Sequence, residues 1–301
     1  MISILIPVYN YNVNELVNDL IRQLKKLNIE FEIVICDDAS DVEYKEKNRQ
    51  LSQLPGIKYF EENINIGRSL IRNKLARLAS YEILIFIDSD ISIKNNDNFI
   101  ENYINSYNPE YAICGGIIYD KNPLEKKYIL RWKYGIKREM KFLNKKNQSK
   151  YIHFFTGNFL INKNVFFKIK FDENLKNYGY EDTLFAYKLM KNGIGIKYIN
   201  NPVLHNIKVE NKVYLEKSLF ALKNLLLIYE NISDYDFIEK IKILKVFYFI
   251  KKLKIDKVFL IFYKVFENLI HKHLVNSNNP SLILFDFYRL GYLCYLNNIK
   301  K

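Results

Sequence analysis

The sequence has few of the features that mark secreted or membrane-spanning proteins. Its 301 residues include only three cysteines, Cys36, Cys114 and Cys294, which are far apart and lack metal-site spacing. An odd number of scattered thiols is typical of a reducing compartment, so we assign these side chains no chemistry. No run of 18 apolar residues occurs, which argues against a spanning helix. The chain enters an apolar run at Ile2 without a basic leader or cleavage site, so we expect a first strand and no secretory signal.

Apolar residues and positive charge are abundant. The hydrophobic content of 49% is ample for a packed core, and the formal net charge is +13. This charge indicates an anionic partner, which could be a nucleotide, a lipid surface or a nucleic acid. The alternative is that the charge only reflects a bias in coding composition. No nucleic-acid recognition motif accompanies the charge, so we expect no nucleic-acid partner.

Strand and helix patterns alternate along the first ninety residues. Short apolar runs and segments of helical period follow one another at 2–8, 13–27, 31–36, 42–54, 57–60, 67–79 and 83–87. This alternation predicts βαβ units and a mainly parallel sheet. Later patterns predict helices at 99–107 and 180–191 and strands at 111–119, 154–161 and 194–199, with a bulge or close backbone approach at Gly115-Gly116. We therefore expect an α/β catalytic domain over residues 1–210.

Beyond this domain the pattern changes to long stretches of helical period, at 213–229, 237–254, 257–272 and 281–296. They predict an all-helical extension over residues 211–301. Residues 237–264 carry eight lysines and two acids among aromatic and aliphatic side chains. Such helices can lie on an anionic membrane, so the helices of residues 237–272 are a candidate membrane surface. The alternative is that they pack on the core with their lysines in solvent.

Two carboxylates follow the apolar run 83–87 directly. The alternation of an extended chain points Asp88 and Asp90 the same way. In open α/β sheets the ligand crevice lies beyond the carboxyl ends of the strands, where an acidic pair suits a divalent ion that bridges to a phosphate. The alternative is a strand end followed by a solvated turn.

A second acidic pair, Asp37 and Asp38, follows the second predicted strand on the same edge. A carboxylate there can accept the imide hydrogen of a uracil base, and a helix cap is an equally good explanation. Gly67 precedes a helix on which Arg68 and Arg72 share a face. These two side chains would meet a base carbonyl or a phosphate, or else solvent.

A third cluster contains Glu181 and Asp182 in the first turn of a predicted helix. The helix dipole favours acids there in any protein, and the functional alternative is a carboxylate that takes a proton from an incoming hydroxyl. His205 follows a strand and a turn at Pro202. This histidine is either structural or a third metal ligand at the functional edge.

Six motifs together resemble a known family. They are Pro7-Val-Tyr-Asn10, Asp37-Asp38-Ala-Ser40, Asn65-Ile-Gly67 with Arg72-Asn73, Asp88-Ser-Asp90, Thr156-Gly157-Asn158 and Tyr178-Gly-Tyr-Glu181-Asp182. In this order, over residues 1 to about 207, they resemble family 2 glycosyltransferases of the GT-A fold, a Rossmann-like sheet flanked by helices. The last motif also resembles the Gly-Trp-Gly-Gly-Glu-Asp segment of galactosyl- and N-acetylgalactosaminyltransferases and chondroitin-type polymerases. It differs by Tyr180 in the aromatic place and by one glycine fewer.

The resemblance implies roles for individual residues. The donor side comprises Pro7, Tyr9, Asp37, Asp38 and Arg72 around the uridine, Asp88 near the ribose and the metal, and Asp90 and His205 as ligands of Mn²⁺ or Mg²⁺. The acceptor side comprises Gly157, Asn158 and Tyr180, with Glu181 in contact with the acceptor and Asp182 as general base.

These roles predict a metal-dependent, inverting glycosyltransferase. It would move a sugar from a UDP-sugar to a glycan or lipid-linked acceptor in surface polysaccharide or lipopolysaccharide synthesis, in the cytoplasm or peripherally on the inner face of the membrane. One alternative is a non-catalytic member that binds glycan or forms a membrane scaffold. The other is a sugar-1-phosphate nucleotidyltransferase, which needs a glycine-rich loop where this chain has Pro7-Val-Tyr-Asn10.

Overall fold

The computed structural model describes residues 1–121, 125–140, 153–175, 178–206, 209–232 and 234–299. The chain forms two compact units. Unit 1 comprises Met1–Ile118, Phe154–Lys176 and Glu181–Asn206, and unit 2 comprises Tyr119–His153, Asn177–Tyr180 and Ile207–Lys301.

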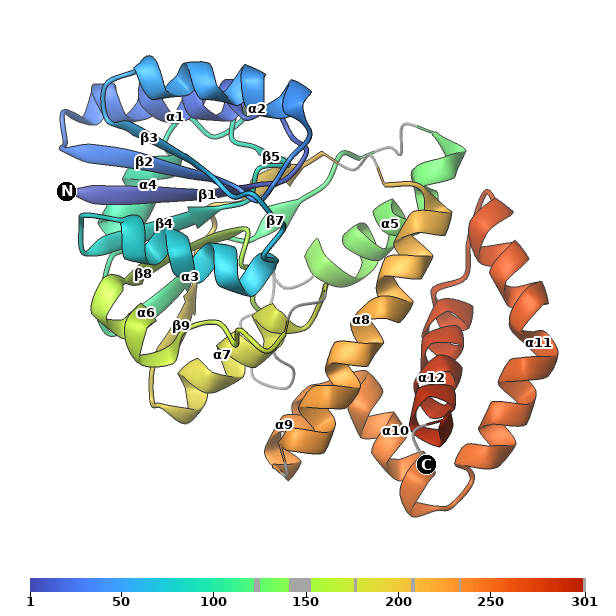
Figure 1. Cartoon of the computed structure of the whole chain (residues 1–301). Helices are drawn as coiled ribbons and strands as arrows, with labels where there is room; N and C mark the ends of the chain where they lie inside the picture. The colour runs from blue at the N-terminus through green and yellow to red at the C-terminus, as the bar shows by residue number, and fades with distance from the viewer. Residues whose placement is uncertain (122–124, 141–152, 176–177, 207–208, 233, 300–301) are drawn as a thin grey trace. The chain divides into compact units, whose positions relative to one another are not determined.

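Unit 1 is built on a seven-stranded sheet (Figure 1). Its strands are β1 (Ile2–Val8), β2 (Phe31–Asp37), β3 (Ile57–Glu61), β4 (Ile83–Ile87), β6 (Tyr111–Cys114), β8 (Asn158–Asn162) and β9 (Gly195–Tyr198), in the order β3-β2-β1-β4-β8-β6-β9. Strand β8 is antiparallel to β4 and β6, and the other pairs are parallel. The central strands are buried on both faces, as their continuous apolar runs require. The predicted mainly parallel α/β sheet is confirmed.

Helices cover both faces of this sheet (Figure 1). One face carries α1 (Asn14–Leu27), α2 (Val42–Arg49) and α4 (Phe99–Ser106), and the other carries α3 (Arg68–Leu78), α6 (Lys163–Ile169) and α7 (Glu181–Lys191). On the first face, Leu20 of α1 and Phe99 of α4 share one apolar core with Ile4 of β1. On the second face, the Phe86 ring stacks on those of Phe159 and Phe166. The alternating side chains of each strand thus supply two separate cores.

A small second sheet lies in the same unit. It consists of β5 (Ile91–Ser92), β10 (Val203–His205) and β7 (Ile117–Ile118), with β10 in the middle. The predicted strand 111–119 is therefore two strands, because Gly115 and Gly116 interrupt it. A side chain on Gly115 would lie 2.6 Å from atoms of Tyr103, Asn158 and Asn201, which confirms a close backbone approach there.

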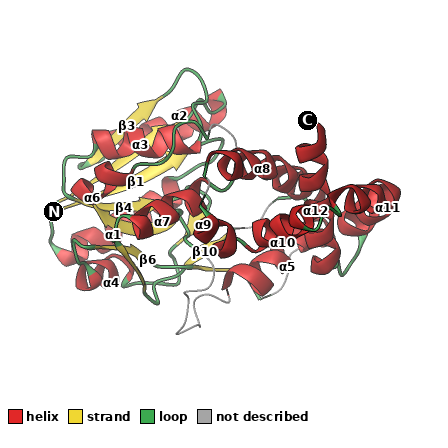
Figure 2. Cartoon of the chain, turned by 90° about the horizontal axis from the view of Figure 1, so that it is seen from below, coloured by secondary structure: helices red, strands yellow, loops and turns green. Residues whose placement is uncertain are grey.

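Unit 2 consists mainly of helices, drawn in red in Figure 2. They are α5 (Ile129–Tyr134), α8 (Asn211–Asn231), α9 (Tyr235–Lys240), α10 (Lys242–Lys252), α11 (Asp256–Asn276) and α12 (Leu282–Ile299). Its core includes Leu130, Tyr214, Tyr263 and Phe285. No helix among the described residues is both long enough and apolar enough to cross a bilayer.

Three predicted boundaries differ from the structure. The helix predicted at 237–254 is broken at Ile241, whose extended backbone (φ −117°, ψ 106°) ends α9 and begins α10. The strand predicted at 154–161 begins only at Asn158, because Thr156 and Gly157 form a turn. The helix predicted at 42–54 ends at Arg49, where a 3₁₀ turn follows.

The predicted division at residue 210 is close to the point where the last segment of unit 2 begins, Ile207. A single domain over residues 1–210 would include residues 119–153 and 177–180. The structure instead assigns both segments to unit 2. Leu130 lies in the core of unit 2, and its amide donates to Asn211 Oδ1 at 2.8 Å. The amide of Asn224 in α8 donates to the Gly179 carbonyl at 3.0 Å. These contacts join both segments to the helical unit.

Candidate active site

The predicted donor residues lie at one edge of the main sheet. Tyr9 follows β1, Asp38 follows β2, and Asp88 and Asp90 follow β4. These three strands are neighbours and parallel. Their carboxyl ends therefore meet at the edge where open α/β sheets bind ligands. The side chain of Tyr9 is 55% exposed, which leaves its ring accessible at this edge.

The carboxylate of Asp38 holds the loop before α3. Its two oxygens accept the backbone N–H groups of Ile66 at 2.6 Å and Gly67 at 3.0 Å. Burial raises the pKa of Asp38, against the effect of these two donors. The neighbouring Asp37 is fully buried and accepts the Ser40 amide at 2.7 Å. Both acids shape the loops that surround the site, and contact of either with a uracil base stays a prediction.

Asp88 is paired with Arg72. The Arg72 Nη2 lies 2.5 Å from Asp88 Oδ1, and the guanidinium, 5.7 Å from the centre of the Phe171 ring, is almost completely buried. The second oxygen of Asp88 lies where a Cβ on Gly157 would come within 2.6 Å of it. Gly157 thus allows the chain to pass close to the Asp88 carboxylate. In this arrangement Asp88 serves the buried arginine, and any contact with a metal stays a prediction.

Asp90 and His205 are brought together by the small sheet. His205 of β10 is opposite Ile91 of β5, and the Asn206 amide donates to the Asp90 carbonyl at 3.2 Å. As a result His205 Nε2 lies 3.3 Å from Asp90 Oδ2. Partial burial raises the pKa of Asp90, but hydrogen bonding and charge from His205, aided by Arg68, lower it to about 2. The carboxylate is therefore ionised at neutral pH.

This pair is suitable for a divalent cation. A carboxylate oxygen and an imidazole nitrogen are both ligands for Mn²⁺, and the two atoms are close enough to share one ion. The side chain of Asp90 is 42% exposed, so a phosphate-bound ion can reach it. Within the described residues no group of three His, Cys, Asp or Glu side chains is gathered as a metal site. Water molecules and substrate phosphates are the usual further ligands of Mg²⁺-type ions.

Glu181 and Asp182 begin α7, as predicted. The Asp182 carboxylate accepts the Thr183 amide at 2.6 Å. Partial burial and the negative charge of Glu181 raise the pKa of Asp182 to about 7, although Thr183 and Arg68 oppose this rise. A carboxyl that titrates near neutrality is suited to general base catalysis.

Arg68 connects the acidic groups on the two sides of the site. Its Nη1 lies 3.4 Å from Glu181 Oε1, and its charge lowers the pKa values of both Asp90 and Asp182. Asp90, the predicted metal ligand, and Asp182, the predicted base, therefore both interact electrostatically with the Arg68 guanidinium. The sequence placed Arg68 on the same helix face as Arg72 but gave no sign that it acts on both Asp90 and Asp182. The sequence feature that could have indicated this role is the position of Arg68 directly after Gly67, at the first residue of α3.

Asn158 is placed differently from its predicted role. Its side chain is fully buried: Nδ2 donates to the carbonyls of Gly116 and Asn201 at 2.8 and 2.9 Å, and Oδ1 accepts the Tyr103 hydroxyl at 2.5 Å. All these partners belong to unit 1. The side chain therefore fastens β8 to the connections of the small sheet, a geometry that favours a positioning role over contact with an acceptor.

We expect Asn158→Ala to destabilise the protein by about 2 kcal/mol, because it leaves the buried Asn201 carbonyl and the buried Tyr103 hydroxyl without their partner. This corresponds to a melting temperature lowered by roughly 4–8 °C, measurable by thermal denaturation. Asn95→Ala, at an exposed position, is the control and should leave the melting temperature unchanged. Loss of activity in Asn158→Ala at an unchanged melting temperature would instead favour the acceptor role.

Tyr180 belongs to unit 2. Its φ is +65° and that of Gly179 is +97°, so two left-handed residues precede α7. The Tyr180 hydroxyl accepts a hydrogen bond from Arg289 Nη2 at 2.7 Å, and a Cβ on Gly179 would lie 2.4 Å from that of Ala221. Helices α8 and α12 thus fix the segment that leads to Glu181. Contact of Tyr180 with an acceptor stays a prediction.

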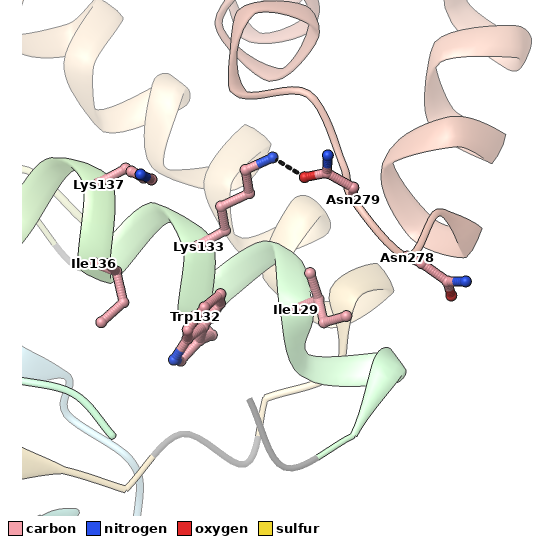
Figure 3. A pocket seen from close by; sticks show the side chains of 7 residues that line it. All are labelled: Ile129, Trp132, Lys133, Ile136, Lys137, Asn278 and Asn279. Carbon is pink, nitrogen blue, oxygen red and sulfur yellow. Dashed lines mark hydrogen bonds between the residues drawn. The ribbon is translucent and has the colours of Figure 1, made fainter. Parts of the chain in front are cut away.

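Unit 2 also contains a cavity of about 240 Å³, shown in Figure 3. Its lining consists of Ile129, Trp132, Lys133, Ile136, Lys137, Asn278 and Asn279. The Lys133 ammonium reaches the Asn279 side chain across it (Figure 3). None of the predicted site residues lines this cavity.

The mainly parallel sheet, with its acids at the carboxyl edge, defines an α/β enzyme of the GT-A glycosyltransferase class. The chain belongs to glycosyl transferase family 2, whose family model matches residues 3–169, more than half of its length. No curated protein sequence matches it.

Two solved structures show the likeness in fold. The mannosyltransferase PcManGT from Pyrobaculum calidifontis, in complex with GDP-Man and Mn²⁺, aligns with 79% of this chain at 13% identity and a TM-score of 0.57. The alignment covers 66% of that protein, slightly under two thirds of its length. Glucosyl-3-phosphoglycerate synthase from Mycobacterium tuberculosis, with Mn²⁺, UDP and glucosyl-3-phosphoglycerate, aligns with 78% of this chain and 81% of its own, at 14% identity and a TM-score of 0.50.

Proposed function

We propose that this family 2 glycosyltransferase is a metal-dependent, inverting enzyme that transfers a sugar from a UDP-sugar to the hydroxyl group of a glycan or lipid-linked acceptor. The observation that carries the proposal is the link through Arg68. This guanidinium acts on Asp90, which stands beside His205, and on the Glu181-Asp182 pair. Arg68 thus interacts electrostatically with both the candidate ion ligand, Asp90, and the candidate general base, Asp182.

On the donor side, Asp90 and His205 would hold Mn²⁺ or Mg²⁺. When bound, this ion supplies positive charge to the diphosphate as the bond to the sugar breaks. Tyr9 is exposed for stacking on the base, and the buried Arg72 keeps the Asp88 carboxylate oriented beside Gly157. The Mn²⁺ complexes of the two structural neighbours support this assignment.

On the acceptor side, Asp182 would accept the proton of the attacking hydroxyl at a carboxylate oxygen. The neighbouring Glu181, 3% exposed and close to Arg68, raises the pKa of Asp182 by its charge and so increases its basicity. Attack opposite the departing diphosphate in a single displacement inverts the anomeric configuration. In this proposal the base and the ion-binding pair would act at opposite ends of the reacting bond.

The base role predicts a pH dependence. Asp182 must be ionised to accept a proton, and its pKa is raised to about 7. We therefore expect kcat/KM to fall about tenfold per pH unit below pH 7 and to level off above it. The measurement is a pH–rate profile at saturating Mn²⁺. A profile that is flat between pH 5 and 8 would contradict this assignment.

The proposed activity is tested with a panel of donors. Release of nucleoside diphosphate from UDP-glucose, UDP-galactose, their N-acetylated forms and GDP-mannose is measured with and without Mn²⁺, and melting temperatures are measured in parallel, because a bound ligand stabilises the folded state. We expect turnover and a melting shift with at least one UDP-sugar, both dependent on Mn²⁺. Binding without turnover would favour a non-catalytic member, and a preference for GDP-mannose would replace UDP by GDP in the proposal.

The biological setting extends the same proposal. An acceptor that is a glycan or a lipid-linked sugar, in surface polysaccharide or lipopolysaccharide synthesis, fits a hydroxyl-activating base. Work at the cytoplasmic face of a membrane would bring the enzyme to such a lipid-linked acceptor. Both statements stay predictions until an acceptor is identified.

A further inference from the structure

Helix α11 carries a row of exposed apolar side chains between residues 258 and 269. The row consists of Val258, Ile261, Phe262, Val265, Phe266 and Leu269, which are between 41% and 68% exposed. Their spacing of three and four residues places them on one face of the helix. Exposed apolar residues are ordinary when scattered, but a continuous helical face of six large ones marks an interaction surface. We call this row the α11 stripe.

The opposite face of α11 is packed in unit 2. Tyr263, Ile270 and Leu274 are buried in its core, and the ring of Tyr263 lies where Gly291 of α12 leaves room for it. Figure 1 shows α11 running alongside α12. The helix is therefore anchored by a separate set of residues, and the stripe is not part of its packing within the described residues.

Charge around the stripe is arranged asymmetrically. Lys257, Lys264 and Lys272 are exposed and seven or eight residues apart, so they line one border of the stripe. The two acids of α11 are engaged with the packed side: Glu267 accepts the Tyr263 hydroxyl at 2.9 Å, and Asp256 accepts from Asn298 at 3.4 Å. The exposed side of the helix is therefore apolar in the centre and basic along its edge.

The turn before α11 continues this surface. Leu253 is 65% exposed, and Lys252 and Lys254 on either side of it are exposed as well. Lys254 has a left-handed φ of +57°, at the turn that leads into α11. Lys252, Leu253 and Lys254 therefore lie next to the first residue of that helix. An apolar residue between two lysines repeats the composition of the stripe.

We propose that the α11 stripe, with these lysines, docks on an anionic lipid bilayer, with α11 lying in the plane of the membrane surface. A helix with an apolar face and a basic border inserts its apolar side chains among the headgroups while the lysines meet lipid phosphates. No described helix is long and apolar enough to cross the bilayer, so the contact is superficial.

The structure narrows the surface that the sequence indicated. Residues 237–272 were predicted to share the role, but Phe237, Leu244 and Phe247 of α9 and α10 are fully buried, and α10 exposes only Val246 and Phe249 as large apolar residues. Docking therefore rests on α11. A second copy of the chain fits this surface less well than a membrane does. Antiparallel pairing of two α11 helices about a two-fold axis would bring both lysine borders to the same side, where their positive charges would repel each other.

The test is sedimentation of the full chain with vesicles of phosphatidylcholine alone or mixed with phosphatidylglycerol. We expect binding to the anionic vesicles to be roughly tenfold or more stronger than binding to the neutral ones, and we expect added salt to weaken it. The triple variant Ile261→Ser, Val265→Ser, Leu269→Ser should lose about tenfold or more of this binding. Ile283→Ser, at a 78% exposed position on α12, is the matched control and should bind like the natural chain.

The folded state of each variant is checked by circular dichroism, and Val265→Glu replaces the triple variant if the latter fails to fold. Equal binding to neutral and anionic vesicles would overturn the proposal, as would unchanged binding of the stripe variants. Sedimentation equilibrium completes the test: a dimer that disappears in the stripe variant would assign the stripe to a second copy and overturn membrane docking. None of these readouts depends on sugar transfer, so their failure leaves the proposed enzymatic function standing.

Discussion

Replacing Asp182 by asparagine should reduce sugar transfer by about 10²- to 10⁴-fold, because general base catalysis contributes about this factor. Asparagine has nearly the same shape, and its carbonyl oxygen can still accept the Thr183 amide that Asp182 holds at 2.6 Å. We therefore expect the affinity for the nucleoside diphosphate to be unchanged. The measurements are donor turnover and the nucleotide-induced shift in melting temperature for both proteins.

The same variant has a stability signature with a defined sign. The pKa of Asp182 in the folded protein, about 7, lies above the value of about 4 for an unfolded aspartate. Ionisation of this carboxyl therefore destabilises the fold increasingly between these pH values and fully above them. Asp182→Asn should melt at a higher temperature than the natural chain at pH 8, and the difference should vanish near pH 4.

Asp172→Asn is the matched control for Asp182. Asp172 lies in the same unit and is paired with Lys188 at 3.0 Å. We expect it to retain turnover within a few-fold. Unchanged turnover in Asp182→Asn would remove the assigned base, and equal losses in both variants would indicate a general disturbance of unit 1.

Replacing Asp90 by asparagine should lower transfer by about 10²- to 10³-fold, the usual effect of losing one group that stabilises developing charge. An amide oxygen is a weaker ligand for a divalent cation than a carboxylate, and the His205 nitrogen 3.3 Å away would lose its anionic neighbour. We expect the Mn²⁺ concentration for half-maximal activity to rise at least tenfold, measured by metal titration after treatment with chelator.

Asp97→Asn is the control for this experiment. The Asp97 side chain is 79% exposed and its contact with Arg22 is at 3.6 Å, so its loss should leave the metal titration unchanged. An Asp90→Asn protein with natural activity and natural metal response would exclude Asp90 as the ion-binding residue. Turnover that is insensitive to chelator in the natural chain would exclude metal dependence itself.

Local patterns were sufficient to predict the sheet and the edge at which the acids lie. The apolar run 83–87 that ends at Asp88 is β4, and the helix predicted to contain Glu181 and Asp182 is α7. These features depend on short-range periodicity and on the rule that parallel strands end at a common edge. The place of Asp88 and Asp90 could therefore be inferred before the tertiary structure was known.

Contacts between distant segments were not predictable in the same way. The burial of Asn158 depends on partners at residues 103, 116 and 201, and the link through Arg68 depends on an acid more than one hundred residues later. The break at Ile241 and the membership of residues 119–153 in unit 2 are likewise set by packing. Sequence periodicity contains no information on which side chain a buried group meets.

The three short strands β5, β10 and β7 have a consequence for stability within unit 1. Each is only two or three residues long, and the pairing that places His205 beside Asp90 rests on two residue pairs of the β5–β10 ladder. So short a ladder resists opening far less than the seven-stranded sheet does. A cation shared by Asp90 and His205 would cross-link β5 and β10. We would then expect β10 to be most stable against local opening when the donor and its cation are bound.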